Sequence, residues 1–200
     1  MNRNDVVREW VRSGIIDFYL YFELDEKWYH YNAFFLHQGL EKLCKAYLLG
    51  ERASEYEGLR NEKVVRRKVE DMAKQMGHDL NSMLKVMKRK NLITKENFKL
   101  GKEPRPNAIK VLLHGYEQCR YPLPVEPVHT KYPVKGKAGF YNDILASSNL
   151  RKAVYPIARQ ILERIQSDFS IDIPKRKATY NNKIDDKQWE RFCRLFFETN

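Results

Sequence analysis

The sequence predicts an all-α fold, an up-and-down bundle of four to five helices with an extra basic helix and a C-terminal helical tail. Apolar residues recur three and four positions apart in several separate segments, which is the spacing of one helix face. No segment alternates apolar and polar residues over the length of a strand. A chain of 200 residues suits one main domain. We expect residues 1–170 to form the bundle, and residues 171–200 to form a basic linker and a short amphipathic helix.

The first helix is expected from about Asp5 to Phe22, where the apolar stripe begins and ends. Asn4 or Asp5 can cap its start, because a short polar side chain accepts a hydrogen bond from the exposed backbone N–H groups. Gly14 lies within the stripe. It is expected to let another helix approach closely, at some loss of helix propensity.

The segment 31–50 has the widest apolar stripe and is expected to lie at the centre of the core. The stripe holds Ala33, Leu36, His37, Leu40, Leu43, Cys44, Tyr47 and Leu48. We expect His37 to be a core histidine with satisfied hydrogen bonds, and Gly50 to end the helix as a left-handed C-cap. A second row, Gln38, Glu41, Lys42 and Lys45, runs beside the stripe. It is interpreted as a solvated face with one Glu41–Lys45 pair, worth a few tenths of a kcal/mol.

Four further helices follow. A basic helix is expected over about 59–76, with its cations on a solvated face, and Asp79 is placed to cap the next helix. Another helix is expected over about 107–118. The last long helix covers about 149–169, where Pro156 predicts a kink or a later start. The tail then carries an apolar face that is expected to pack on the bundle or on a second chain; it consists of Trp189, Phe192, Cys193, Phe196 and Phe197.

The composition favours an acidic partner. The net charge is +11, which nucleic acid, a nucleotide or an acidic protein could each match. The three cysteines are far apart and form no Cys-x-x-Cys pair, so neither a disulfide framework nor a zinc site is indicated. We expect a reducing, cytoplasmic location and no cofactor or metal. No apolar run reaches the roughly 20 residues that a membrane span needs, so we expect no membrane association.

Four segments in order resemble the HEPN domain family, in the branch associated with minimal nucleotidyltransferases. They are HQGLEKLCKAYLL, GHDLNSML, LLHGYEQCRYP and FYNDILASSNLRKAVYPIARQI. That branch shows Q-x-x-E-K-x-x-K-A on its second helix, H-D-L opening the third and R-Y-P after the fourth. The matching residues here are Gln38, Glu41, Lys42, Lys45 and Ala46, then His78, Asp79 and Leu80, then Arg120, Tyr121 and Pro122. The resemblance covers about Val6 to Ile165.

The resemblance implies a helical bundle that forms a homodimer, and many members of the family are ribonucleases, toxins or RNA-processing factors. Their metal-free cleavage uses an R-x4–6-H motif, and no arginine of this chain has a histidine five to seven positions later. We therefore predict a non-catalytic module with no catalytic residue. It would bind a nucleotide, RNA or a nucleotidyltransferase-type partner in a toxin–antitoxin or defence-like setting. The alternative is a divergent metal-free HEPN ribonuclease that uses Arg120 with His78 or His129.

The candidate site residues have two readings. As ligand-binding residues, Lys45, His78 and Arg120 would hold phosphate oxygens, since a guanidinium forms bidentate hydrogen bonds. As structural residues, Glu41 and Asp79 would serve as an ion-pair partner and a helix cap. We favour the structural reading, in which Arg120 pairs with Glu41 and holds the end of the fourth helix against the second.

Overall fold

The computed structural model describes residues 1–24, 29–94, 112, 148–180 and 183–198; of residues 29–33, 148 and 149 it describes only the helical backbone. Six α-helices occur in this part of the chain: α1 (Arg3–Glu23), α2 (Tyr29–Glu51), α3 (Glu62–Gln75), α4 (Leu80–Arg89), α7 (Ser148–Phe169) and α8 (Asp186–Phe197). Two short 3-10 helices, η2 (Ala53–Glu55) and η4 (Lys177–Thr179), lie between them. No strand is present in the described residues, which confirms the all-α prediction for them. The helix expected at about 107–118 lies outside the described residues.

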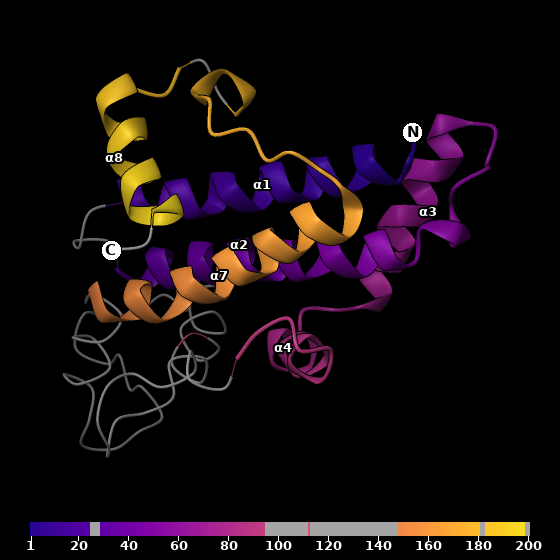
Figure 1. Cartoon of the computed structure of the whole chain (residues 1–200), viewed down its shortest axis with the longest axis horizontal. Helices are drawn as coiled ribbons and strands as arrows, with labels where there is room; N and C mark the ends of the chain where they lie inside the picture. Colours follow the sequence, from indigo (N-terminus) through magenta and orange to yellow (C-terminus); the bar gives the residue numbers. More distant parts are fainter. Residues whose placement is uncertain (25–28, 95–111, 113–147, 181–182, 199–200) are drawn as a thin grey trace, which may run out of the picture.

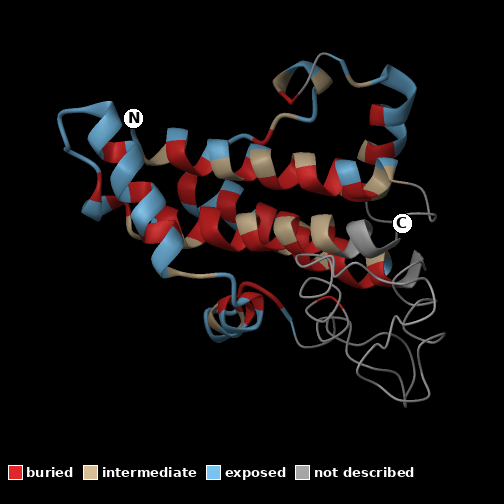
Figure 2. Cartoon of the chain, turned by 180° about the vertical axis from the view of Figure 1, so that it is seen from behind, coloured by how far each residue is buried: buried red, intermediate tan, exposed pale blue. Residues whose placement is uncertain are grey.

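Three long helices form the body of the molecule (Figure 1). α1 and α2 pack along each other in opposite directions, and α7 lies against α2 and runs the same way as α2. α4 packs on α2 and is seen end-on, so it lies across the long helices, and α8 stands across α1. Buried residues line the inner faces of the long helices, whereas α3 exposes most of its surface (Figure 2). None of the described helices combines the length and apolar character that crossing a membrane requires.

Two glycines allow α1 and α2 to approach closely. A Cβ atom at Gly39 would lie 2.9 Å from the Phe18 ring, and one at Gly14 would lie 3.0 Å from the carbonyl oxygen of Gly39. Either methyl group would push the helices apart, so backbone packs against backbone and ring at this crossing. The close approach expected at Gly14 is confirmed.

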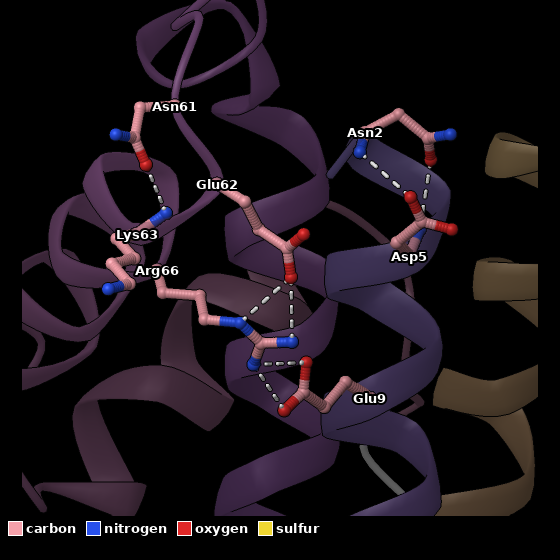
Figure 3. A network of polar contacts seen from close by, with 7 residues as sticks. All are labelled: Asn2, Asp5, Glu9, Asn61, Glu62, Lys63 and Arg66. Carbon is pink, nitrogen blue, oxygen red and sulfur yellow. Dashed lines mark hydrogen bonds and ion pairs between the residues drawn. The ribbon is translucent and has the colours of Figure 1, made fainter.

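The start of α1 lies two residues upstream of the expected one. Asn2, rather than Asn4 or Asp5, is the N-cap: its side chain accepts from the backbone N–H of Asp5 at 3.0 Å. The Asp5 carboxylate accepts in return from the backbone N–H of Asn2 at 2.9 Å (Figure 3). This reciprocal capping box satisfies two backbone donors that would otherwise have no helical partner.

The expected C-cap at Gly50 is wrong, because this glycine lies inside α2. It is buried, and a Cβ atom there would lie 2.6 Å from the ring of Phe169 and 3.0 Å from Val7. The absence of a side chain at Gly50 therefore makes room for Phe169 and Val7, and it does not serve a left-handed turn. Among the described glycines, Gly58 and Gly77 have the positive φ angles.

The C-terminal helix α8 folds back on the same chain. Trp189, Phe192 and Phe196 are buried in the main core. The ring of Phe192 meets that of Tyr19 with centroids 5.6 Å apart, and Phe196 meets Phe18 at 4.9 Å. This apolar face was expected to pack on the bundle or on a second chain, and in the structure it packs on the bundle of its own chain.

Candidate functional site: a buried charge cluster beside a basic helix

The polar row of α2 is largely buried, so its interpretation as a solvated face is wrong. Glu41 is 3% exposed and Lys45 4% exposed, and His37 is completely buried. The physical reason is that α1, α7, α4 and α3 all pack on α2 and cover more than its apolar stripe. Only one other polar side chain in the described part of the chain is buried to this degree, that of Asp17 on α1.

Glu41 is the centre of this cluster. Its Oε1 accepts from the Lys45 Nζ at 2.8 Å and lies 3.0 Å from the Nδ1 of His78. Its Oε2 lies 3.6 Å from the Nδ1 of His37. The Lys45 ammonium also lies 5.9 Å from the centre of the Trp10 ring, within the range of a cation–π interaction. One carboxylate therefore joins an ammonium and two imidazoles.

The protonation of His37 follows from its position. Burial lowers its pKa to about 3, and the electrostatic influence of the neighbouring His78 and Lys45 acts in the same direction. His37 is therefore neutral at pH 7, so the buried charges near it are those of Glu41 and Lys45, which compensate each other.

A second compensated pair joins α1 to α2. The Lys42 Nζ lies 2.6 Å from the Oδ2 of Asp17, and the two side chains are 25% and 10% exposed. Burial raises the pKa of Asp17, and the ammonium of Lys42 partly opposes that rise. Lys42 was expected to be an ordinary exposed charge, but it is the partner of a buried carboxylate. The sequence analysis missed Asp17, although an aspartate within the apolar stripe of an expected helix is itself unusual.

His78 lies at the edge of the cluster, in the turn between α3 and α4. Gly77 makes this turn with a φ of +67°, which L side chains rarely adopt. Asp79 caps α4: its carboxylate accepts from the backbone N–H of Ser82 at 3.0 Å and from the Ser82 hydroxyl at 2.6 Å. These hydrogen bonds lower the pKa of Asp79. The turn is thus fixed on both sides of His78, whose side chain is 51% exposed while its Nδ1 faces Glu41.

The outer face of α4 continues from His78. Its residues Asn81, Ser82, Lys85, Lys88 and Arg89 fall on one side of the helix, opposite the buried Leu80, Met83, Leu84 and Met87. α4 itself contains no acidic residue. The carboxylates at its two ends are Asp79, its N-cap, whose pKa the charge of Lys85 helps to lower, and Glu51, which pairs with the C-cap residue Lys90 at 2.8 Å. Lys85 and Arg89 are exposed and have no ion-pair or hydrogen-bond partner among the described residues. This face is therefore positively charged.

The structure brings Glu41, Lys45 and His78 together, and it places Asp79 next to His78 as the cap of α4. Lys45 is buried against Glu41 and Trp10, so its ammonium is not offered to a ligand in solution. Arg120 and His129 lie outside the described residues, and the proposed Arg120–Glu41 pair stays a prediction. His37 had been expected as a core histidine, but its place beside Glu41 was not expected.

The cluster has a definite chemical capacity. A carboxylate at Nδ1 favours the histidine tautomer that carries its proton there, which fixes the orientation of the His78 ring. No group of three His, Cys, Asp or Glu side chains within the described residues is arranged to hold a metal ion.

No protein-family model matches the chain, and no curated protein or solved structure shows significant similarity to it.

Proposed function

We propose that this chain is a HEPN-like helical module that binds RNA without cleaving it, in a toxin–antitoxin or defence-like setting. The observation that carries the proposal is the outer face of α4, where the exposed cations Lys85 and Arg89 occur in a helix without an acidic residue, next to the exposed His78. Cations without a carboxylate partner can neutralise phosphates and release their counterions. The net charge of +11 adds a longer-range attraction for a polyanion.

The state of the cluster supports binding rather than cleavage. Metal-free cleavage of RNA needs proton donors and acceptors within reach of the phosphate and the attacking hydroxyl. Of the three groups around Glu41, His37 is buried and neutral and Lys45 is committed to the carboxylate, so His78 alone reaches solvent. The lack of an R-x4–6-H motif in the sequence agrees with a binding role.

The test measures how salt affects binding of a labelled single-stranded RNA, using fluorescence anisotropy. Each phosphate contact contributes about −0.7 to the slope of log K against log salt for a single strand. A Lys85→Gln/Arg89→Gln variant should therefore bind more weakly, with a slope smaller in magnitude by about 1.4. The control is Lys187→Gln/Arg194→Gln, which removes the same charge from exposed positions on α8. No binding by the parent at low salt, or equal losses in both variants, would refute the proposal.

A divergent metal-free HEPN ribonuclease is the second candidate, and one observation favours it. The contact between His78 Nδ1 and the buried Glu41 resembles the arrangement in which a carboxylate orients a catalytic imidazole. Incubating the protein with a mixed RNA pool and a chelator separates the two candidates. Intact RNA supports the binding module. Cleavage that His78→Gln abolishes, while the variant still binds RNA, would establish the enzyme.

The resemblance also supports a homodimer and a nucleotidyltransferase-type partner. The apolar face of α8 does not contribute to this part of the proposal, because it is buried on its own chain. Light scattering at micromolar concentration tests the homodimer, and a monomeric mass would count against it. A nucleotide could meet the same cations on α4, and displacement of labelled RNA by adenosine monophosphate would reveal that ligand.

A further inference from the structure

A groove of about 420 Å³ runs between α1 and the chain that follows α7. The first wall is formed by Arg8, Val11 and Arg12 of α1, and the second by Ile171, Asp172, Ile173, Pro174, Thr179 and Tyr180. Figure 1 shows this second segment leaving the end of α7 and passing beside α1 on its way to η4. The groove is separate from the Glu41 cluster and from α4, and none of its residues takes part in the proposed RNA site.

The second wall has the character of a strand without a neighbour. Ser170 ends α7 with a φ of +53°, and the chain then continues without helix or turn through residue 176. Ile171 and Ile173 are buried and Asp172 between them is exposed, which is the alternation of a strand. Within the described residues, the backbone N–H and C=O groups of these three make no hydrogen bond.

This segment is also held in place. The Tyr180 hydroxyl donates to the carbonyl of Pro174 at 2.6 Å, and the Trp189 indole N–H donates to the carbonyl of Lys175 at 2.8 Å. The extended backbone is therefore fixed before any partner arrives. Pairing with a partner strand would then cost less conformational entropy, because this segment is already ordered.

The first wall provides positive charge. Arg8 is exposed and has no partner among the described residues. Arg12 donates to the carbonyl of Tyr180 at 3.0 Å, which positions its guanidinium at the groove. The carboxylate of Glu9 at the groove is engaged by Arg66, at 3.2 Å (Figure 3). The remaining cations at the groove therefore exceed its one other carboxylate, that of Asp172.

We propose that this groove binds an extended acidic peptide from a partner protein. The peptide would add as a strand to the backbone of residues 171–173 and place carboxylates on Arg8 and Arg12. A peptide fits better than a nucleic acid, because its alternating N–H and C=O groups can pair with those of the segment. A polynucleotide would satisfy the two arginines but leave the backbone acceptors of the segment unmatched.

The first experiment tests the charge contacts, with a fluorescent peptide of about eight alternating glutamate and valine residues, a typical strand length. Anisotropy should show binding by the full chain. Arg8→Gln/Arg12→Gln should weaken it about tenfold, since exposed charge pairs contribute modestly each. Lys187→Gln/Arg194→Gln is the control of equal charge and should leave binding unchanged. No binding by the parent, or equal weakening in both variants, would overturn the proposal.

The second experiment tests the strand pairing. Alternate amides of a strand point to opposite edges, so N-methylation of one alternate set in the peptide should abolish binding and methylation of the other set should preserve it. Hydrogen exchange of residues 171–173 should slow when the unmodified peptide binds. Equal binding of both methylated peptides would overturn the pairing. So would complete displacement of the peptide by single-stranded RNA through the same two arginines, since that result would assign the groove to a polyanion.

Discussion

Replacing Glu41 by glutamine is the most direct test of the buried cluster. Glu41 and Lys45 lie 2.8 Å apart, with side chains only 3% and 5% exposed. At an effective dielectric constant of about 20, two charges at this distance attract by about 6 kcal/mol. Desolvation opposes this by several kcal/mol per ion, so the intact pair contributes little net stability. The Glu41→Gln change removes the attraction but leaves the ammonium buried, and should destabilise the fold by about 3–5 kcal/mol.

Urea unfolding followed by circular dichroism at neutral pH measures this loss. Lys45→Met strands the carboxylate instead and should also destabilise the fold. The double variant should lose clearly less than the sum of the two single losses, because it leaves neither charge alone. Glu55→Gln is the matched control, since this exposed carboxylate pairs with Arg52 at the surface, where water screens the charges, and its loss should change stability little. A loss for Glu41→Gln as small as that of the control, or strict additivity, would refute the buried coupling.

Three further predictions concern the same packing. Lys42→Met should destabilise the fold by about 1–3 kcal/mol at pH 7, because Asp17 loses its cation. This loss of unfolding free energy, measured in urea, should become smaller at lower pH, where the Asp17 carboxyl is protonated. An unchanged urea midpoint at pH 7 would contradict the pair. Gly39→Ala should lower the melting temperature despite its better helix propensity, since the new methyl group meets Phe18, and a higher melting temperature would refute the tight crossing. His37 binds a proton below pH 6.5 when unfolded but only near pH 3 when folded, so stability falls as the pH drops through this window. The parent should therefore lose about 2 kcal/mol more than His37→Gln between pH 7 and 5, and equal losses would show that His37 does not titrate in this way.

The apolar periodicity was sufficient to predict the helices that the structure describes. The stripe around Leu40 placed α2 at the centre, and the polar residue before Leu80 placed the cap of α4 at Asp79. These features depend on contacts within one helix or on the exclusion of apolar groups from water. Both can be predicted from residues that are close together in the sequence.

The burial of Glu41 and Lys45 could not be predicted in the same way. Two oppositely charged residues four positions apart have the same spacing whether water or protein surrounds them. What distinguishes the two cases is the packing of several helices on α2, which depends on contacts between residues far apart in the sequence. Gly50 illustrates the same limit, because a helical glycine beside Phe169 and a C-cap glycine occupy similar positions in the sequence.

The arrangement of charge connects the buried cluster to the proposed surfaces. In the described core, Asp17 is matched by Lys42 and Glu41 by Lys45, so these buried pairs contribute nothing to the net charge of +11. The excess must therefore come from cations outside these pairs, and the described ones include Lys85 and Arg89 on α4 and Arg8 on α1. Leaving such charges uncompensated is destabilising for the isolated chain through mutual repulsion. An acidic partner relieves that repulsion, so both proposed sites lie at exposed cations without an ion-pair partner rather than at the buried cluster itself.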